Sequence, residues 1–562
     1  MKFALRNTKT IWLLVLAALL VLIAVDRSNW ARVSQWREDQ SATMWLGFTQ
    51  SAFSLPVGLI SSVHTPNPNG MPLFALLLSR LPNLWSVSTT LGILQGILVL
   101  WIGWLVVGRS TKFFLLTLPV LASVILRATS VEFWNQWVMT SINLFYFGLL
   151  VYYLNRPSVW KVPLLLVPML LAPAFYLAGL ANAVVFFLLA ALVMVLKPPH
   201  GSRKTWRFSV LACVLLVGAA LWLTWIPYAQ AMAGQTLPST GMDLESLKNR
   251  FMNTLQSLVD FPIWNEMHWV TNTPDYFYQS STQILPIAAK HVSTLTHFLT
   301  LGQSAIFMAL LALALVILHI KRRTLDQFFL PGRQRLGAIV LLSMAFVVLS
   351  FVVSAALLGP FWANGVRTDQ TVQFLPFVLM AWFGFPFVVR LPRWVRFAAV
   401  SLTGIIAAAF VISNLVLGAQ VVSAHLDYRG SYLSDADVPL VQKEQVVGFI
   451  AQDWESVSTS KTVAVTYDLG GNKWNYLPEF GQPLEQWYPA PMTMGRAFDY
   501  ELRRVYGLSN SQEGIQLRPL FPTRYVVSYA FMPEPVQAGV TLQHFIFGRL
   551  RVSVVQTELS AH

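Results

Sequence analysis

Residues 11–25 are IWLLVLAALLVLIAV, fifteen consecutive apolar side chains without a charge. An α-helix needs about 20 mostly apolar residues to span the hydrocarbon core of a bilayer, so this stretch is close to one span in length. Lys2, Arg6 and Lys9 precede it, as in a signal peptide, but no small-x-small cleavage site follows and the chain continues through Asp26. The stretch therefore predicts a retained signal-anchor helix.

Similar apolar blocks recur over the first 420 residues. Of the 562 residues, 55% are hydrophobic and only 11% are charged, and the mean hydropathy is +0.56. A soluble domain has about 25% charged residues, so this chain has too few to cover a water-facing surface. Uninterrupted blocks, rather than alternating patterns, indicate that helices cross the membrane. The predicted spans lie near residues 11–25, 86–108, 113–126, 141–154, 162–177, 180–196, 208–226, 298–320, 337–357, 372–389 and 397–420.

Positive charges are distributed unequally between the loops that alternate along these spans. If the N-terminus is cytoplasmic, the loops on its side contain 19 Lys and Arg residues and one acid, Asp326. The opposite loops before residue 421 contain 9 cations and 10 acids. This asymmetry is the positive-inside rule, and it predicts a multi-pass protein of the cytoplasmic membrane with its N-terminus inside. The formal net charge of +14 is therefore a topology signal and gives no support to nucleic-acid binding.

The last 142 residues differ from the rest in composition. Residues 421–562 contain 11 Lys and Arg against 14 Asp and Glu. We expect a helix that begins around Asp437-Val-Pro439 and continues to about Trp454, and strands over 461–467, 524–529 and 545–555. The overall prediction is a polytopic α-helical membrane protein with about eleven transmembrane helices over residues 1–420. A small α/β domain over residues 421–562 follows, and it is extracytoplasmic because eleven crossings is an odd number.

Two acidic residues stand out in the first long external loop, within Trp36-Arg-Glu-Asp-Gln40. Glu38 and Asp39 have two interpretations. They begin a helix, where the helix dipole favours carboxylates, or they supply a general base close to the bilayer surface. The proline- and glycine-rich run from Pro56 to Pro72 follows and ends at an apolar segment. Irregular backbone at this depth is tolerated only where it lines a polar cavity or is buried by protein.

The run from Pro56 to Pro72 contains Gly58, Ser61-Ser62 and Pro66-Asn67-Pro68. A first loop with acidic residues followed by this pattern resembles the first loop of the GT-C superfamily of membrane glycosyltransferases. The nearest resemblance is to bacterial relatives of protein O-mannosyltransferases and of lipid A aminoarabinose transferases. Three later segments sit where that family places similar ones, in the same order and on the external side. They are Glu132-Phe-Trp-Asn-Gln136, Trp225-Ile-Pro-Tyr228 and Arg367-Thr-Asp-Gln-Thr-Val-Gln-Phe-Leu-Pro376.

The resemblance implies transfer of a sugar from a polyprenyl-phosphate carrier to an acceptor on the outer face, with inversion at the anomeric carbon. It implies Asp39 as the general base, with Glu38 as the alternative. Arg367 is the first candidate for binding the departing phosphate, although it equally suits a pair with Asp369 or an interfacial position. The other candidates are Arg127 and His64 for the phosphate and Glu132 as a second acid, which equally suits a helix cap. A divalent cation, the sugar and the acceptor stay undetermined.

Two other function classes compete with this interpretation. A lipid or sugar transporter, or a flippase, usually carries ionisable groups inside its spans or repeated halves, and the sequence shows neither. A non-catalytic membrane scaffold would leave the first-loop carboxylates without a role. The polar residues inside spans, Asn143, Asn182 and Asn414, are expected to hydrogen-bond between helices. The single cysteine, Cys213, excludes an intrachain disulfide.

Overall fold

A computed structural model describes two parts of the chain, one on either side of a long interval. The described residues are 2–34, 36, 38–49, 57–60, 66–108, 112–133, 135–177, 179–233, 392–427, 438–469, 495–511, 524–530 and 541–556. Three predicted spans, near 298–320, 337–357 and 372–389, lie outside them.

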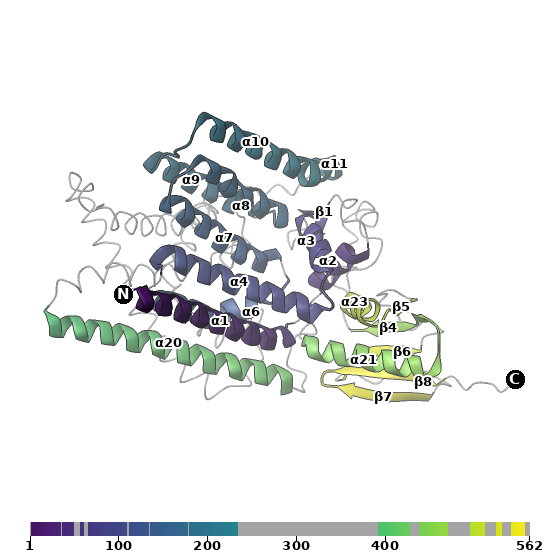
Figure 1. The fold of residues 1–562 in the computed structure, drawn as a ribbon. Coiled ribbons are helices and arrows are strands. Elements are labelled where there is room, and N and C mark those ends of the chain that lie inside the picture. Colours follow the sequence, from purple (N-terminus) through teal and green to yellow (C-terminus); the bar gives the residue numbers. More distant parts are fainter. Residues whose placement is uncertain are drawn as a thin grey trace, which may run out of the picture.

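The described residues before the long interval, together with residues 393–427 after it, form a bundle of helices (Figure 1). The long helices α1, α4, α7, α8, α9 and α10 lie side by side in a stack, and α20 packs against α5 and α6. The elements of this bundle are α1 (Lys2–Arg32), α2 (Glu38–Thr49), β1 (Val57–Ile60), β2 (Pro66–Pro68), α3 (Gly70–Leu78), α4 (Leu84–Val107), α5 (Lys112–Ala122), α6 (Val124–Ser130), α7 (Asn135–Asn155), α8 (Val162–Phe175), α9 (Gly179–Leu196), α10 (Arg203–Ala220), the π-helical turn Leu221–Trp225, α11 (Ile226–Met232) and α20 (Arg393–Asp427).

Among the described residues, four helices are long and apolar enough to cross a membrane. They are Thr10–Arg32, Leu84–Val107, Val138–Asn155 and Arg203–Met232. Each contains or overlaps a predicted span. The predicted spans 162–177 and 180–196 correspond to two shorter apolar helices, Val159–Phe175 and Gly179–Val195. The predicted span 397–420 lies within α20.

The predicted single span over 113–126 is wrong in one respect, because the structure divides it into α5 and α6. The backbone of Ser123 leaves the helical region, with φ −49° and ψ 123°, and its hydroxyl accepts a hydrogen bond from the backbone N–H of Leu126. Serine is a preferred N-cap residue because its side chain satisfies an N–H that the new helix leaves without a partner. Ser123 therefore ends one helix and starts the next.

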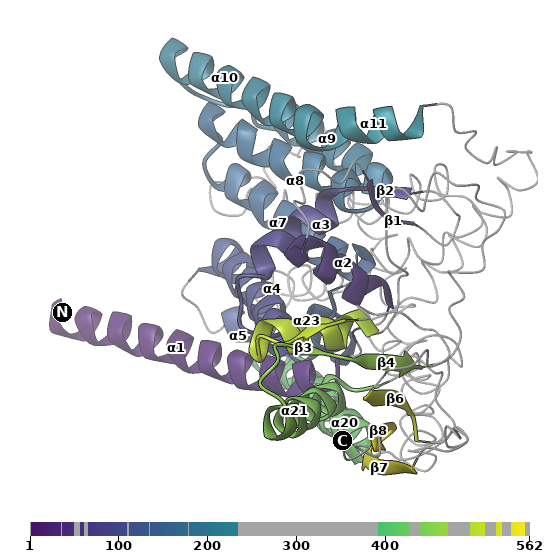
Figure 2. The ribbon, with the colours of Figure 1, turned by 90° about the vertical axis from the view of Figure 1, so that its right-hand side faces the viewer.

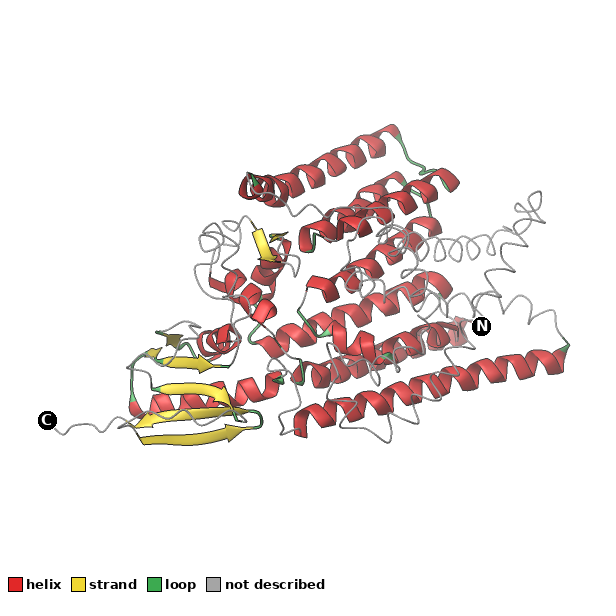
Figure 3. Cartoon of the chain, turned by 180° about the vertical axis from the view of Figure 1, so that it is seen from behind, coloured by secondary structure: helices red, strands yellow, loops and turns green. Residues whose placement is uncertain are grey.

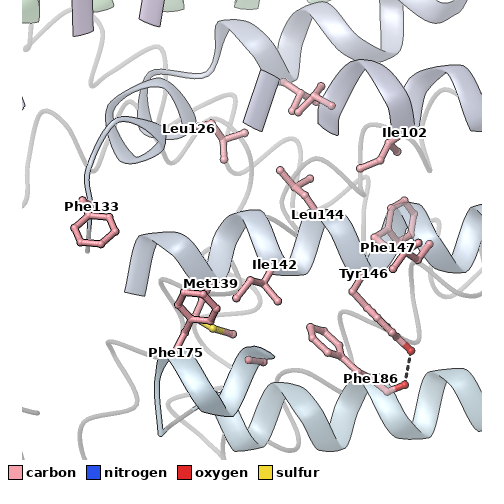
Figure 4. Close-up of a cluster of buried hydrophobic side chains, with 14 of the residues drawn as sticks. Ile102, Leu126, Phe133, Met139, Ile142, Leu144, Tyr146, Phe147, Phe175 and Phe186 are labelled. Carbon is pink, nitrogen blue, oxygen red and sulfur yellow. Dashed lines mark hydrogen bonds between the residues drawn. The ribbon is translucent and has the colours of Figure 1, made fainter. Parts of the chain in front are cut away.

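Helix α7 lies at the centre of the bundle core, and Figure 4 shows its side chains between those of its neighbours. The rings of Tyr146 and Phe186 stack with centroids 4.0 Å apart, and the Tyr146 hydroxyl donates to the Phe186 carbonyl. Asn182 Nδ2 donates to Asn143 Oδ1 at 2.8 Å, which joins α9 to α7. The expectation that these two asparagines bond between helices is confirmed.

The described residues from 438 to 556, namely 438–469, 495–511, 524–530 and 541–556, form an α/β unit that we call the C-terminal unit. Figure 3 shows its strands gathered at one end of the helical stack. Among its described residues, four strands form a sheet in the order β4-β6-β8-β7, in which β4 and β6 are parallel and the other pairs are antiparallel. Its elements are α21 (Leu440–Val457), β3 (Thr462–Val463), β4 (Val465–Asp468), α23 (Gly495–Val505), β5 (Ser509–Asn510), β6 (Tyr525–Tyr529), β7 (Thr541–Phe547) and β8 (Leu550–Gln556).

The predicted single strand over 545–555 is wrong, since the chain there forms the hairpin of β7 and β8. The turn occurs at Gly548, whose φ is +62°. Glycine adopts a positive φ without the steric cost that a Cβ would bring. The expected helix near 439–454 and the strands near 461–467 and 524–529 agree with α21, with β3 and β4, and with β6.

The C-terminal unit packs directly on the helical bundle. Helix α23 lies against α2, as Figure 2 shows from the side. The backbone N–H of Leu440 donates to the Ser34 carbonyl at 2.9 Å, and Arg504 donates to the carbonyls of Arg80 and Leu81 at 3.0 and 3.2 Å. Tyr500 is a buried member of the same hydrophobic cluster as the bundle core. The contact is therefore continuous with the interior of the bundle.

Candidate active site at the start of α2

Trp36 lies in the short connection between α1 and α2, which we call the Trp36 turn, and it is fully buried. Its φ is +44°, and among the described residues it is the only one other than glycine with a positive φ. Its indole N–H donates to Ser88 Oγ at 3.0 Å, and its ring stacks on Phe133 with centroids 5.8 Å apart. A tryptophan in this conformation costs about 1–3 kcal/mol and persists only where its surroundings hold it. The turn is thus fixed by contacts from other helices.

Glu38 and Asp39 are the first two residues of α2. The expectation that they begin a helix is confirmed, and the helix dipole favours carboxylates there. Their side-chain positions lie outside the described part of the structure. The role of Asp39 or Glu38 as a base stays a prediction.

Glu132 comes from the segment between α6 and α7, yet it reaches the first turn of α2. Gln40 Nε2 donates to Glu132 Oε2 at 3.0 Å, and only 8% of Glu132 is exposed. Phe133, which follows it, stacks on Trp36. Two segments about 90 residues apart therefore meet at one buried corner, which we call the α2 corner and define by Trp36, Gln40, Glu132 and Phe133.

Arg127, in α6, is also buried, and it binds Asp26, an acid that the sequence alone does not mark as a partner. Its Nε donates to Asp26 Oδ2 at 3.1 Å, and its Nη2 donates to Asp26 Oδ1. Its Nη1 donates to the Asn414 carbonyl at 3.3 Å, and its guanidinium lies 5.3 Å from the centre of the Trp30 ring. As found here, Arg127 joins α6 to α1 and α20. Donor binding by Arg127 stays a prediction.

A second arginine shares the Asp26 carboxylate. Arg27 Nη1 donates to Asp26 Oδ2, and Arg27 Nη2 donates to the Leu121 carbonyl at 3.3 Å. Both guanidinium groups are buried, whereas the Asp26 side chain is 27% exposed. The ion cluster of Asp26, Arg27 and Arg127 has two positive charges and one negative charge.

The remaining predicted residues are placed as follows. His64 and Arg367 lie outside the described residues. The expectation of irregular backbone between Pro56 and Pro72 is wrong for the described residues of that run, which form the antiparallel strands β1 and β2 and the first turn of α3. Asn67, in β2, and Asn69, just before α3, are buried; Asn67 Oδ1 accepts from the Leu177 N–H at 2.9 Å and Asn69 Nδ2 donates to the Leu223 carbonyl at 3.0 Å. The described end of the run is thus buried by protein, one of the two arrangements expected at its depth.

Charged residues of the C-terminal unit also reach this end of the bundle. Glu501 Oε1 accepts a hydrogen bond from the Leu84 N–H, at the first turn of α4, over 2.6 Å. Burial raises the pKa of the Glu501 carboxyl to about 8; the Leu84 hydrogen bond lowers it and nearby Glu444 raises it. Burial also raises the pKa of Glu444, and Arg32 opposes that shift.

No metal centre emerges from the described residues, since none of their His, Cys, Asp and Glu side chains form a group of three that could hold an ion. Comparison with protein-family models and with curated proteins finds no match to this chain. The choice of the α2 corner as the candidate site therefore rests on its geometry and on the sequence motifs.

Sequence reasoning missed Asp26, Gln40 and Lys443. Asp26 directly follows the first apolar run, and Gln40 follows the Glu38-Asp39 pair, but no sequence pattern assigns either residue a partner. The Lys443 ammonium is fully buried and donates to the Trp36 carbonyl at 2.8 Å. No local signal distinguishes it from a solvated lysine of an amphipathic helix.

Proposed function

We propose that this chain is an integral membrane glycosyltransferase of the GT-C type. It transfers a sugar from a polyprenyl-phosphate carrier to an acceptor on the extracytoplasmic face of the cytoplasmic membrane. The observation that supports this best is the hydrogen bond from Gln40 to Glu132. It joins the first two loops on the proposed external side at the helical turn that contains Glu38 and Asp39.

In this proposal Asp39 accepts the proton of an acceptor hydroxyl while the hydroxyl oxygen attacks the anomeric carbon. The bond from that carbon to the carrier phosphate breaks, and the phosphate leaves with the electron pair, so the configuration inverts. Glu38 is the alternative base. Arg367, Arg127 and His64 are the candidates that stabilise the leaving phosphate, and Glu132 is the second acid of the site.

The test uses purified protein in lipid nanodiscs with a panel of polyprenyl-phosphate sugars, and it follows donor loss and product formation. A positioned base contributes about 10²–10⁴-fold, so Asp39→Asn should lower kcat by that factor. Asp468→Asn, at an exposed position of β4, is the matched control and should retain full activity. If Asp39→Asn stays active and Glu38→Gln does not, the base is Glu38. If both stay active, the proposed base is wrong.

The proposed orientation rests on the distribution of Lys and Arg, and it can be tested separately. A reporter at the N-terminus should react only in permeabilised cells, whereas one inserted at exposed Lys461 should react in intact cells. Labelling of both reporters from the same side would contradict the proposed topology.

One observation favours a transporter or flippase as the second candidate. The ion cluster of Asp26, Arg27 and Arg127 joins α1 to α6, and Asp26 and Arg27 lie within the candidate membrane span Thr10–Arg32. Ionisable groups inside membrane helices often mark a transport path. Reconstituted vesicles that flip a labelled polyprenyl phosphate but transfer no sugar would support this alternative and contradict the transferase.

A further inference from the structure

The C-terminal unit reaches the α2 corner through the first turn of α21. The Leu440 N–H donates to the Ser34 carbonyl at 2.9 Å, and one turn further Lys443 Nζ donates to the Trp36 carbonyl at 2.8 Å. The ammonium comes from a residue 407 positions away in the chain. The turn before α2 is thus held by the last part of the protein as well as by the bundle.

The Trp36 carbonyl is fully used by this arrangement. A carbonyl oxygen has two lone pairs, and it accepts one bond from Ser41 Oγ at 2.8 Å and one from Lys443 Nζ at 2.8 Å. Ser41 belongs to α2 itself, so its hydrogen bond links α2 to the Trp36 turn that precedes it. Lys443 supplies the second hydrogen bond from α21 in the C-terminal unit.

Burying an ammonium group is costly, and such a group is retained where it makes a specific interaction. Lys443 has no exposed surface. It acts on a turn whose positive φ requires external support. Glu38 and Asp39 follow Trp36 by two and three residues and form the start of α2, so the direction of the turn sets where α2 begins.

We infer that Lys443 is a positioning residue, through which the C-terminal unit fixes the Trp36 turn and thereby places the first-turn carboxylates of α2. This inference rests on the proposed function for its catalytic consequence, but its structural part does not. Loss of the ammonium should loosen the first turn of α2 without removing any group that touches substrate.

The test compares Lys443→Met, which keeps the length and removes the donor, with Lys443→Gln, which keeps a donor without the charge. Lys461→Met, at an exposed lysine of the same unit, is the matched control. In hydrogen–deuterium exchange on the full chain in nanodiscs, Lys443→Met should speed exchange at least about tenfold over residues 42–45, whose amides donate to the carbonyls of the first turn of α2. Lys443→Gln should give a smaller increase, and Lys461→Met none.

Two further readouts separate the outcomes. In the transfer assay, Lys443→Met should lower kcat and leave KM for the donor unchanged, because α2 is misplaced while donor contacts remain. If Lys443→Met does not fold, Ser41→Ala removes the other donor to the same carbonyl and should give the same local increase in exchange. Unchanged exchange over residues 42–45 in folded Lys443→Met, or in Ser41→Ala if it replaces that variant, overturns the inference. If the wild type transfers no sugar, the proposed function fails, while the exchange result still decides the role of Lys443.

Discussion

Among the described residues, Asp26 is the acid that pairs with two buried arginines, and its removal would leave both without this carboxylate partner. Its two oxygens accept from Arg27 Nη1 and from Arg127 Nε and Nη2. Breaking a buried ion pair by deleting one partner is strongly destabilising, because the remaining charge is neither solvated nor compensated. The cluster therefore contributes to the stability of the fold by linking α1 to α6.

Asp26→Asn should lower the free energy of unfolding by about 3–5 kcal/mol, the usual cost of an uncompensated buried charge. A thermal-unfolding series in detergent, read by intrinsic tryptophan fluorescence, measures the effect. The exposed control Asp468→Asn should stay within about 0.5 kcal/mol of the wild type. Equal melting temperatures for the two variants would show that the cluster is not a stabilising joint.

Helices α1 and α4 approach closely because α4 carries a glycine at the contact. A Cβ built on Gly92 would lie 2.8 Å from Arg27 Cβ, which is too close to the α1 backbone to move aside. Small residues allow close packing between membrane helices, where dispersion contacts supply much of the association energy. Helix α1, which carries Asp26 and Arg27, can therefore pack this closely against α4 because Gly92 has no side chain.

Gly92→Ala should destabilise the protein by about 1–3 kcal/mol, the range for an overpacked contact. Gly218→Ala is the matched control, because among the described residues no atom beyond the helix's own backbone lies within 4 Å of a Cβ built there. That substitution should be neutral or stabilising, since alanine favours helix. Thermal shifts of the two variants in opposite directions support the packing account, and a neutral Gly92→Ala contradicts it.

The elements show which features could be predicted from sequence. Long apolar runs gave α1 and α4, and the proline at position 439 marked the start of α21, because these signals are local. The division at Ser123 and the hairpin at Gly548 were missed, since each depends on one residue inside a longer apolar or alternating pattern. Lys443 was missed for another reason. Its hydrogen bond to the Trp36 carbonyl joins residues 407 positions apart, and no local pattern of the sequence predicts such a contact.

At the scale of the whole molecule, the C-terminal unit and the bundle share a buried contact that contains an acid. Glu501 reaches the first turn of α4 and has a pKa of about 8 because burial disfavours its charged form. In the unfolded chain a glutamate titrates near its ordinary value of about 4.3. Between about pH 4.3 and pH 8, the Glu501 carboxyl therefore keeps its proton in the folded state and has released it in the unfolded state.

Stability should therefore be greatest, as far as Glu501 is concerned, below about pH 4.3 and should fall as the pH rises towards 8. Glu501→Gln, which cannot ionise and can still accept from Leu84, should flatten this slope. Melting temperatures measured from pH 5 to pH 9 check the prediction, with Lys461→Met as a control that keeps the wild-type slope. A variant slope equal to that of the wild type would exclude Glu501 as its source.

The bond from Lys443 to Trp36 spans most of the polypeptide, and this has a consequence for biogenesis. During synthesis the N-terminal segments emerge from the ribosome and fold first. The Trp36 turn must then wait for over 400 further residues to be translated before its last donor arrives. In a nascent or prematurely terminated chain the first helix would already be formed, yet the α2 corner would stay incomplete. If the proposed transfer takes place at the α2 corner, such a chain should be inactive until translation has passed α21.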